Sequence, residues 1–305
     1  MNLKKLFLFL LGTIILILAI LKFDIINNFI KIKDSINYLY IIFSIVAINS
    51  VIVLRAYRWK FLLRELDICK LTYFDALKIS GSSFFLSSIT PNRLGEVSKV
   101  FMVKENRIQG FAAFSIEYLT DTFAAFFVPL VLAIIVVYNV KLIILSSLII
   151  VLVCLIAYLF LNIKLIEKIM LKLLPKSKIL IENKKKVIQY FNEYLKNKKI
   201  VFISIFIAIL NFLIALLIGY IIFLSIGINI NFIVIVSGLA IAHLIGILSF
   251  IPLGVGIREV SAIGFFGLYS IDYGLALNGM IIYRIVTFSV IFFGYLLYLI
   301  NLKKM

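Results

Sequence analysis

No charged residue occurs between Ile200 and Ile257, and this uncharged run restricts the fold more than any other feature of the sequence. A helix that spans a bilayer needs about 20 mainly apolar residues, so the run is too long for one crossing. Turn-forming residues from Gly227 to Asn231 interrupt it. We therefore predict one span that ends near Leu224 and a second apolar segment after it, in an integral membrane protein.

The rest of the 305-residue chain has the same character, with 64% hydrophobic and 15% charged residues. This charge content is roughly ten points below that of an ordinary soluble domain. The pattern predicts an all-α polytopic protein of about six to eight spans, in one transmembrane domain over residues 1–305. The predicted spans are Leu6–Phe23, Ile36–Leu54, Phe111–Val137, Leu142–Ile163, a segment that starts at Ile200, and Tyr273–Ile300.

Lysine and arginine residues give the chain a formal charge of +17, but they concentrate in a few segments between the apolar runs. In a membrane protein this bias indicates orientation rather than nucleic-acid binding. A segment with eleven lysines, 164–199, separates a first half, 1–163, from a second half, 200–305, and is predicted to be cytoplasmic. Arg55 and Arg58 mark the loop after the second span as cytoplasmic too. Both termini then lie on the cytoplasmic side of the cell membrane.

Two segments are predicted to enter the membrane and turn back. Only fourteen uncharged residues separate Lys78 from Arg93, a length more typical of a re-entrant segment than of a span. A hairpin at 79–92 also keeps the flanking basic segments on one side. The same parity argument makes the stretch from Phe232 to about Ser270 a hairpin entered from the opposite face. The two halves would then form an inverted repeat.

Apolar residues recur at helical spacing within the basic segment, from Leu165 to Leu174 and again from Val187 to Leu195. Amphipathic helices of this kind lie in the membrane interface, and their lysines favour anionic headgroups by about 1 kcal/mol each. We therefore expect anionic headgroups at Lys164–Lys199. The alternative is that these lysines only orient the chain.

One motif, S-x-x-P-x-x-x-G, occurs once in each half and is the most specific feature of the sequence. Each copy is followed closely by a glutamate and has an arginine nearby. Proline removes a backbone donor and glycine permits a sharp bend, so each copy predicts a helix that stops and restarts. The residues are Ser88, Pro91, Arg93, Gly95 and Glu96 in the first copy, and Ser249, Pro252, Gly254, Gly256, Arg258 and Glu259 in the second.

Broken helices at matching places in two halves point to the substrate site of a transporter. The start of the second helix offers unpaired N–H groups and a partial positive charge, which suit an anion such as a phosphate. The alternative is a pair of proline kinks that only shape the bundle.

Several ionisable residues are expected inside the membrane. Arg284 lies within the last predicted span, where a charge costs at least ~2.5 kcal/mol, so it requires a partner. Glu117 and Asp121 lie one helical turn apart, and either could be that partner. A structural ion-pair network is the alternative to a functional role. The predicted headgroup ligands are Arg93, Arg258, Arg284, Ser88 and Ser249, and the predicted ion-pair or proton-relay residues are Glu96, Glu117, Asp121 and Glu259.

The P-x-R-L-G-E of Pro91 to Glu96 and the I-P-x-G-x-G-x-R-E of Ile251 to Glu259 resemble the transmembrane region of lysylphosphatidylglycerol synthases and its stand-alone, flippase-like relatives. The resemblance extends from about Ile36 to Ile300. In this chain Asn92 and Leu253 take the places where glycine is expected after each proline. The pairs Arg58-Trp59 and Tyr283-Arg284 are similar to the family as well.

The resemblance implies a lipid-translocating activity. The chain ends at Met305, without the soluble aminoacyl-transferring domain of the full synthases, so lysine transfer to a lipid is not expected. We expect a translocase for an anionic or polyprenyl-phosphate lipid that is not an enzyme and uses no cofactor. The alternatives are a membrane subunit or scaffold of a lipid or glycan pathway, and a membrane-embedded lipid-phosphate enzyme. The sole histidine, His243, is expected to be a packed residue rather than a proton relay or metal ligand.

Overall fold

The computed structural model describes residues 3–23, 29–30, 33–34, 36–88, 90, 95–103, 106–139, 183–228, 230–249 and 251–302. All regular structure in these ranges is helical. Four of the described helices are long and apolar enough to cross a membrane. The prediction of an all-α polytopic membrane protein is therefore confirmed. The predicted span Leu142–Ile163 and the basic stretch before Asn183 lie outside the described ranges.

The first half contains two of the four long spans. One of them, residues Tyr38–Glu65, is formed by two helices that join at Asn49. The helices described in this half are α1 (Leu3–Lys22), α3 (Tyr38–Ile48), α4 (Ser50–Glu65), α5 (Tyr73–Ser88), α6 (Ser98–Met102) and α7 (Arg107–Asn139).

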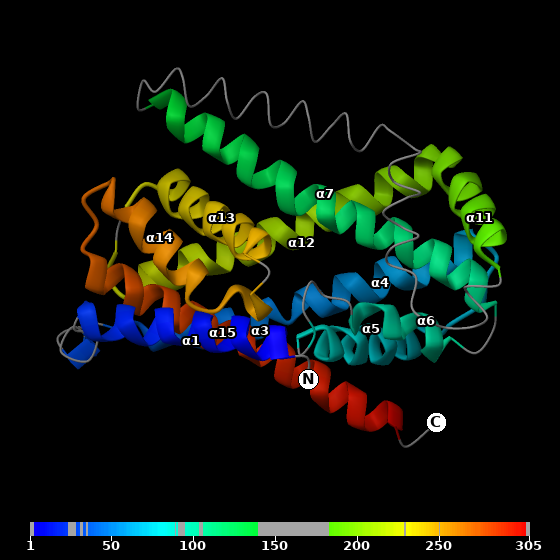
Figure 1. Cartoon of the computed structure of the whole chain (residues 1–305), viewed down its shortest axis with the longest axis horizontal. Coiled ribbons are helices and arrows are strands. Elements are labelled where there is room, and N and C mark those ends of the chain that lie inside the picture. Colours follow the sequence, from blue (N-terminus) through cyan, green and yellow to red (C-terminus); the bar gives the residue numbers. More distant parts are fainter. Residues whose placement is uncertain are drawn as a thin grey trace.

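The second half repeats this order of a long span, a broken pair of shorter helices and another long span (Figure 1). Its first long helix ends at Ser225, close to the predicted end near Leu224. Asn231 caps the next helix by accepting a hydrogen bond of 2.9 Å from the N–H of Ile233. The elements are α11 (Lys184–Lys196), α12 (Lys198–Ser225), α13 (Phe232–Leu248), the 3-10 turn η2 (Pro252–Gly254), α14 (Ile257–Gly267) and α15 (Tyr273–Leu302).

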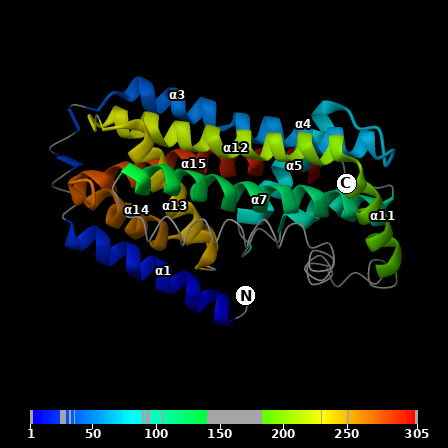
Figure 2. The same ribbon diagram turned by 90° about the horizontal axis from the view of Figure 1, so that it is seen from above.

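The two halves run in opposite directions along the bundle. The α3–α4 span is antiparallel to α12, and α7 is antiparallel to α15 (Figures 1 and 2). Helices α5 and α13 enter from opposite ends and stop near the middle, and α6 and α14 return toward the end from which each began. Each entering helix packs on a long span of the other half, α5 on α15 and α13 on α7. This arrangement is the predicted inverted repeat with two opposed hairpins.

Two apolar clusters hold the described helices together. The larger one surrounds Phe223 and Phe266, which are fully buried between α12, α13, α14 and α15. The smaller one surrounds Trp59, Phe111 and Phe191 at the end where α4, α7 and α11 meet. Within a bilayer the close packing of such side chains, rather than their removal from water, holds the helices together.

The structure corrects the prediction at α4. The span was predicted to end at Leu54, with Arg55 and Arg58 in a cytoplasmic loop, but the helix continues to Glu65. Arg55 is 5% exposed and Arg58 is fully buried. Their charges therefore belong to the interior of the bundle and give no information on loop orientation.

Helix α11 confirms the amphipathic pattern predicted from Val187 to Leu195, but its apolar face is not free to lie on a membrane. Val187 and Phe191 are fully buried, in the cluster that also contains Trp59 and Phe111. The lysines at 184–186 are exposed on the other face. The helix is therefore docked on α7, and only its basic face remains available to headgroups.

Candidate functional site

Each hairpin break brings the glutamate of its motif against an arginine of a long helix. Glu96 lies 3.0 Å from Arg55 of α4, and Glu259 lies 2.5 Å from Arg284 of α15. Both glutamates are nearly fully buried, at 2% and 1% exposed. Because a buried carboxylate needs a partner, these two ion pairs fix the position of each returning helix against a span.

The ion pair at the first break belongs to a larger network. Asp121 bridges Arg55 and Arg58, and its carboxylate lies 2.7 Å from Arg58. Glu117 bridges Arg58 at 3.0 Å and Lys99 at 2.8 Å. We call this network the first charge cluster; its members are the cations Arg55, Arg58 and Lys99 and the carboxylates Glu96, Glu117 and Asp121.

The first charge cluster is electrically neutral, with three cations and three carboxylates among the described residues. Every carboxylate of the cluster contacts a cation, and all of its members except the partly exposed Asp121 are buried. This charge balance is compatible with the alternative of a structural ion-pair network, and the role of Glu96, Glu117 and Asp121 as relay residues stays a prediction.

The second break has a different charge balance. Arg284 donates to Glu259 and, at 3.2 Å, to the backbone carbonyl of Leu253. Arg258 is the second cation, and it interacts electrostatically with Arg284 and Tyr283. The second charge cluster, defined as Arg258, Glu259 and Arg284, therefore has one positive charge in excess.

Arg258 has no carboxylate of its own among the described residues. Its Nε atom is buried without a hydrogen-bond partner there, and its guanidinium carbon lies 6.0 Å from the centre of the Tyr283 ring. A side chain at Gly246 would overlap the Arg258 stem, and one at Gly254 would lie within 2.8 Å of it. The absence of side chains at Gly246 and Gly254 thus leaves the space that the Arg258 stem fills.

The backbone of the second break is tightly constrained. Glu259 accepts a hydrogen bond of 2.8 Å from the N–H of Gly256, which caps α14. Gly256 has φ +80°, and a side chain there would overlap the carbonyl of Gly12 in α1. Leu253, which stands where the family pattern has glycine, also adopts a positive φ of 56°. A side chain in this left-handed region costs roughly 1–2 kcal/mol, and the neighbouring contacts maintain it.

The motif serines form hydrogen bonds with the backbone, and their predicted role as headgroup ligands stays a prediction. Ser249 donates to the carbonyl of Gly246 and accepts from the N–H of Ile251, while Ser88 donates to the carbonyl of Phe85. Gly95 packs directly on the end of α5 and donates its N–H to Thr90. Pro91 and Arg93 lie outside the described ranges, and Pro252 begins the turn η2.

The predicted partner of Arg284 was wrong. Glu117 and Asp121 share one face of α7 as expected, but they bind Arg55, Arg58 and Lys99 instead. The sequence reasoning missed these three cations because it assigned two of them to a loop. One signal was available: Arg55 and Arg58 are three residues apart and so share a helix face.

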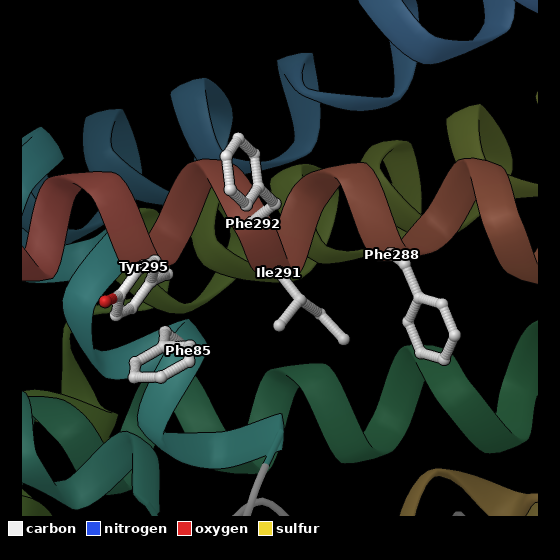
Figure 3. Close-up of a pocket in the computed structure, with 5 residues that line it drawn as sticks. All are labelled: Phe85, Phe288, Ile291, Phe292 and Tyr295. Carbon is white, nitrogen blue, oxygen red and sulfur yellow. The ribbon is translucent and has the colours of Figure 1, made fainter.

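An apolar pocket of about 380 Å³ lies beside α15, next to the end of α5 (Figure 3). On α15, Phe288, Ile291 and Tyr295 follow Arg284 at helical spacing, so they continue the face of the helix that carries it. From Arg284 to Tyr295 the helix rises about 16 Å. The residues that line the pocket are Phe85, Phe288, Ile291, Phe292 and Tyr295.

These features define a helical membrane protein with two opposed, broken hairpins and buried charges at each break. Comparison with protein families places the chain within one such class: it belongs to the family described as the lysylphosphatidylglycerol synthase TM region, which matches residues 6–294. No curated protein and no solved structure matches the chain. The chain is therefore a membrane protein of a family involved in lipid handling, and membrane lipids surround its apolar helices.

Proposed function

We propose that the protein is a translocase that moves an anionic or polyprenyl-phosphate lipid between the leaflets of the cell membrane, with both termini in the cytoplasm. The excess positive charge of the second charge cluster is the observation that carries this proposal. A cation inside the bilayer is costly unless it is paired, so residues of this kind are retained for a ligand or a relay. A lipid phosphate would supply the missing negative charge.

Arg258 is the residue through which the phosphate binds. Its aliphatic stem packs against Gly246 and Gly254, and its buried Nε–H has no acceptor among the described residues. Arginine suits phosphate because its planar group donates two parallel hydrogen bonds. Arg284 adds positive charge nearby, while Glu259 keeps it oriented.

The hydrocarbon chain of the lipid follows the apolar pocket beside α15. Phe288 is 45% and Phe292 60% exposed on the surface of the protein, where they would contact lipid. Because the pocket continues the helix face that carries Arg284, one lipid could place its phosphate near the break and its chain along the aromatic side chains. The headgroup then stays in the polar interior while the chain remains in hydrocarbon.

The test is lipid transfer in liposomes that contain the purified protein and an acyl-labelled anionic lipid, read as access of an impermeant quencher to the inner leaflet. Arg258→Gln removes the excess charge without breaking the Arg284–Glu259 ion pair, so the fold should persist. We expect transfer to slow by tenfold or more, with unfolding temperature unchanged or raised. Arg64→Gln is the matched control, because the Arg64 side chain is 75% exposed.

Equal transfer by wild type and Arg258→Gln across several anionic lipids would contradict the proposed role of this charge. Absence of transfer by the wild type would favour the alternative of a non-catalytic membrane subunit. The neutral first charge cluster is the observation that supports that alternative, since its ion pairs require no ligand.

A further inference from the structure

Asn211 in α12 has a buried side-chain amide and belongs to neither charge cluster. It is 8% exposed, and neither its Nδ2 nor its Oδ1 atom has a hydrogen-bond partner among the described residues. Buried polar groups in native proteins are normally paired, and in a membrane no water from the solvent replaces the missing partner. An amide with both its donor and its acceptor unpaired therefore indicates a ligand.

The position of Asn211 connects the two charge clusters. Ser204 lies two turns earlier on the same face of α12, and it contacts the first charge cluster, since its carbonyl accepts from Arg58 at 3.4 Å. Ala215 lies one turn later on that face, and its carbonyl accepts from Tyr283 at 3.2 Å. From Ser204 to Ala215 the helix rises about 16 Å. Asn211 lies between the two levels.

The second end of this face is close to the proposed phosphate site. The ring of Tyr283 packs on Gly219, one turn beyond Ala215, and its hydroxyl reaches back toward the level of Asn211. The Arg258 guanidinium lies over the same ring. Through Tyr283, the face of α12 that carries Asn211 is therefore linked to the level of Arg258.

We propose that Asn211 binds the lipid headgroup as it passes between the two charge clusters. This inference rests on the proposed function and adds a property of the substrate. The Nδ2 group can donate to a phosphate oxygen, while Oδ1 requires a donor. The headgroup it fits therefore carries, besides the phosphate, at least one hydroxyl or ammonium group.

The experiment compares wild type with Asn211→Leu, which has a similar size and no polar atoms. Transfer of acyl-labelled phosphatidylglycerol, whose headgroup has hydroxyls, should fall at least fivefold. Transfer of labelled phosphatidic acid, whose headgroup is the phosphate alone, should fall less. The unfolding temperature should stay the same or rise, because the variant removes a buried unpaired amide. Arg64→Gln is again the control, since the Arg64 side chain is 75% exposed and lies outside the proposed site.

Unchanged transfer of both lipids by Asn211→Leu overturns the inference, and an equal loss for both lipids overturns the requirement for a donor. Binding is measured separately, as the rise in unfolding temperature of the detergent-solubilised protein with short-chain phosphatidylglycerol. If the wild type binds but does not transfer lipid, the proposed transport fails, and a smaller rise in Asn211→Leu still supports the site. If the wild type shows no rise and no transfer, both proposals are wrong.

Discussion

Arg258 and Arg284 lie at the same hairpin break, but replacing them should have different effects on folding and on transport. Arg284 is bound to the buried carboxylate of Glu259, so its loss leaves a negative charge unpaired in the interior. A defect in an Arg284 variant would therefore report on folding as much as on transport. Arg258 pairs with no carboxylate among the described residues, so its neutralisation leaves no buried negative charge unpaired. A transport defect in an Arg258 variant would therefore report on ligand binding rather than on folding.

We expect Arg284→Met to lower the free energy of unfolding by about 3–5 kcal/mol, the usual result of removing one partner of a buried ion pair. The double variant Arg284→Met with Glu259→Gln should recover much of this loss, because the glutamine can still accept from the N–H of Gly256 and no charge remains unpaired. Denaturation in detergent measures both. A double variant as unstable as the single one would show that the pair does not act through its charge.

At the scale of the helical element, the second break depends on the contact between α1 and the start of α14. Gly256→Ala places a methyl group against the Gly12 carbonyl and on a backbone with φ +80°. We expect a loss of roughly 1–3 kcal/mol in unfolding free energy. Gly264→Ala is the control within the same helix, because open space surrounds Gly264. It should be neutral or stabilising by up to about 1 kcal/mol, and similar losses in the two variants would contradict the role of the contact.

The breaks of the helices could be predicted from the sequence because their causes are local. Proline, glycine and a capping asparagine act on the backbone within a few residues, so the ends of α12 and α13 and the hairpin positions follow from the chain itself. The pairing of the charges could not be predicted in this way. Glu96 and Arg55 are distant in sequence, and whether an arginine belongs to a loop or to a buried helix depends on a carboxylate that the tertiary fold supplies.

At the scale of the whole molecule, the inverted repeat predicts on which face of the membrane the flanks of each hairpin lie. The segments before α5 and after α6 lie at the end of the bundle that carries α11, whereas the connection between α14 and α15 lies at the opposite end (Figures 1 and 2). A hairpin that crossed the membrane instead would place its two flanks on opposite faces. Labelling with a membrane-impermeant thiol reagent distinguishes the two arrangements.

We expect Lys70→Cys, Arg107→Cys and Lys185→Cys to react from one face of the membrane and Leu268→Cys from the other. All four positions are exposed, and the native Cys69 and Cys154 are first replaced by serine. Reaction of Lys70→Cys and Arg107→Cys from opposite faces would show that the first hairpin is a complete crossing.

The unequal charge of the two breaks has an electrical consequence. With the site empty, the second charge cluster holds one positive charge in excess among the described residues, and a singly charged lipid phosphate cancels it. Moving one elementary charge through 100 mV is worth about 2.3 kcal/mol, so voltage should act on the return of the empty site and hardly on the step that carries the lipid. In liposomes with an imposed potassium diffusion potential, reversing the voltage should change the rate of the empty return step in wild type. In Arg258→Gln the empty cluster is neutral and the loaded one negative, so the voltage should act on the lipid-carrying step instead. In the wild type the second hairpin would then respond to the membrane potential only while no lipid is bound.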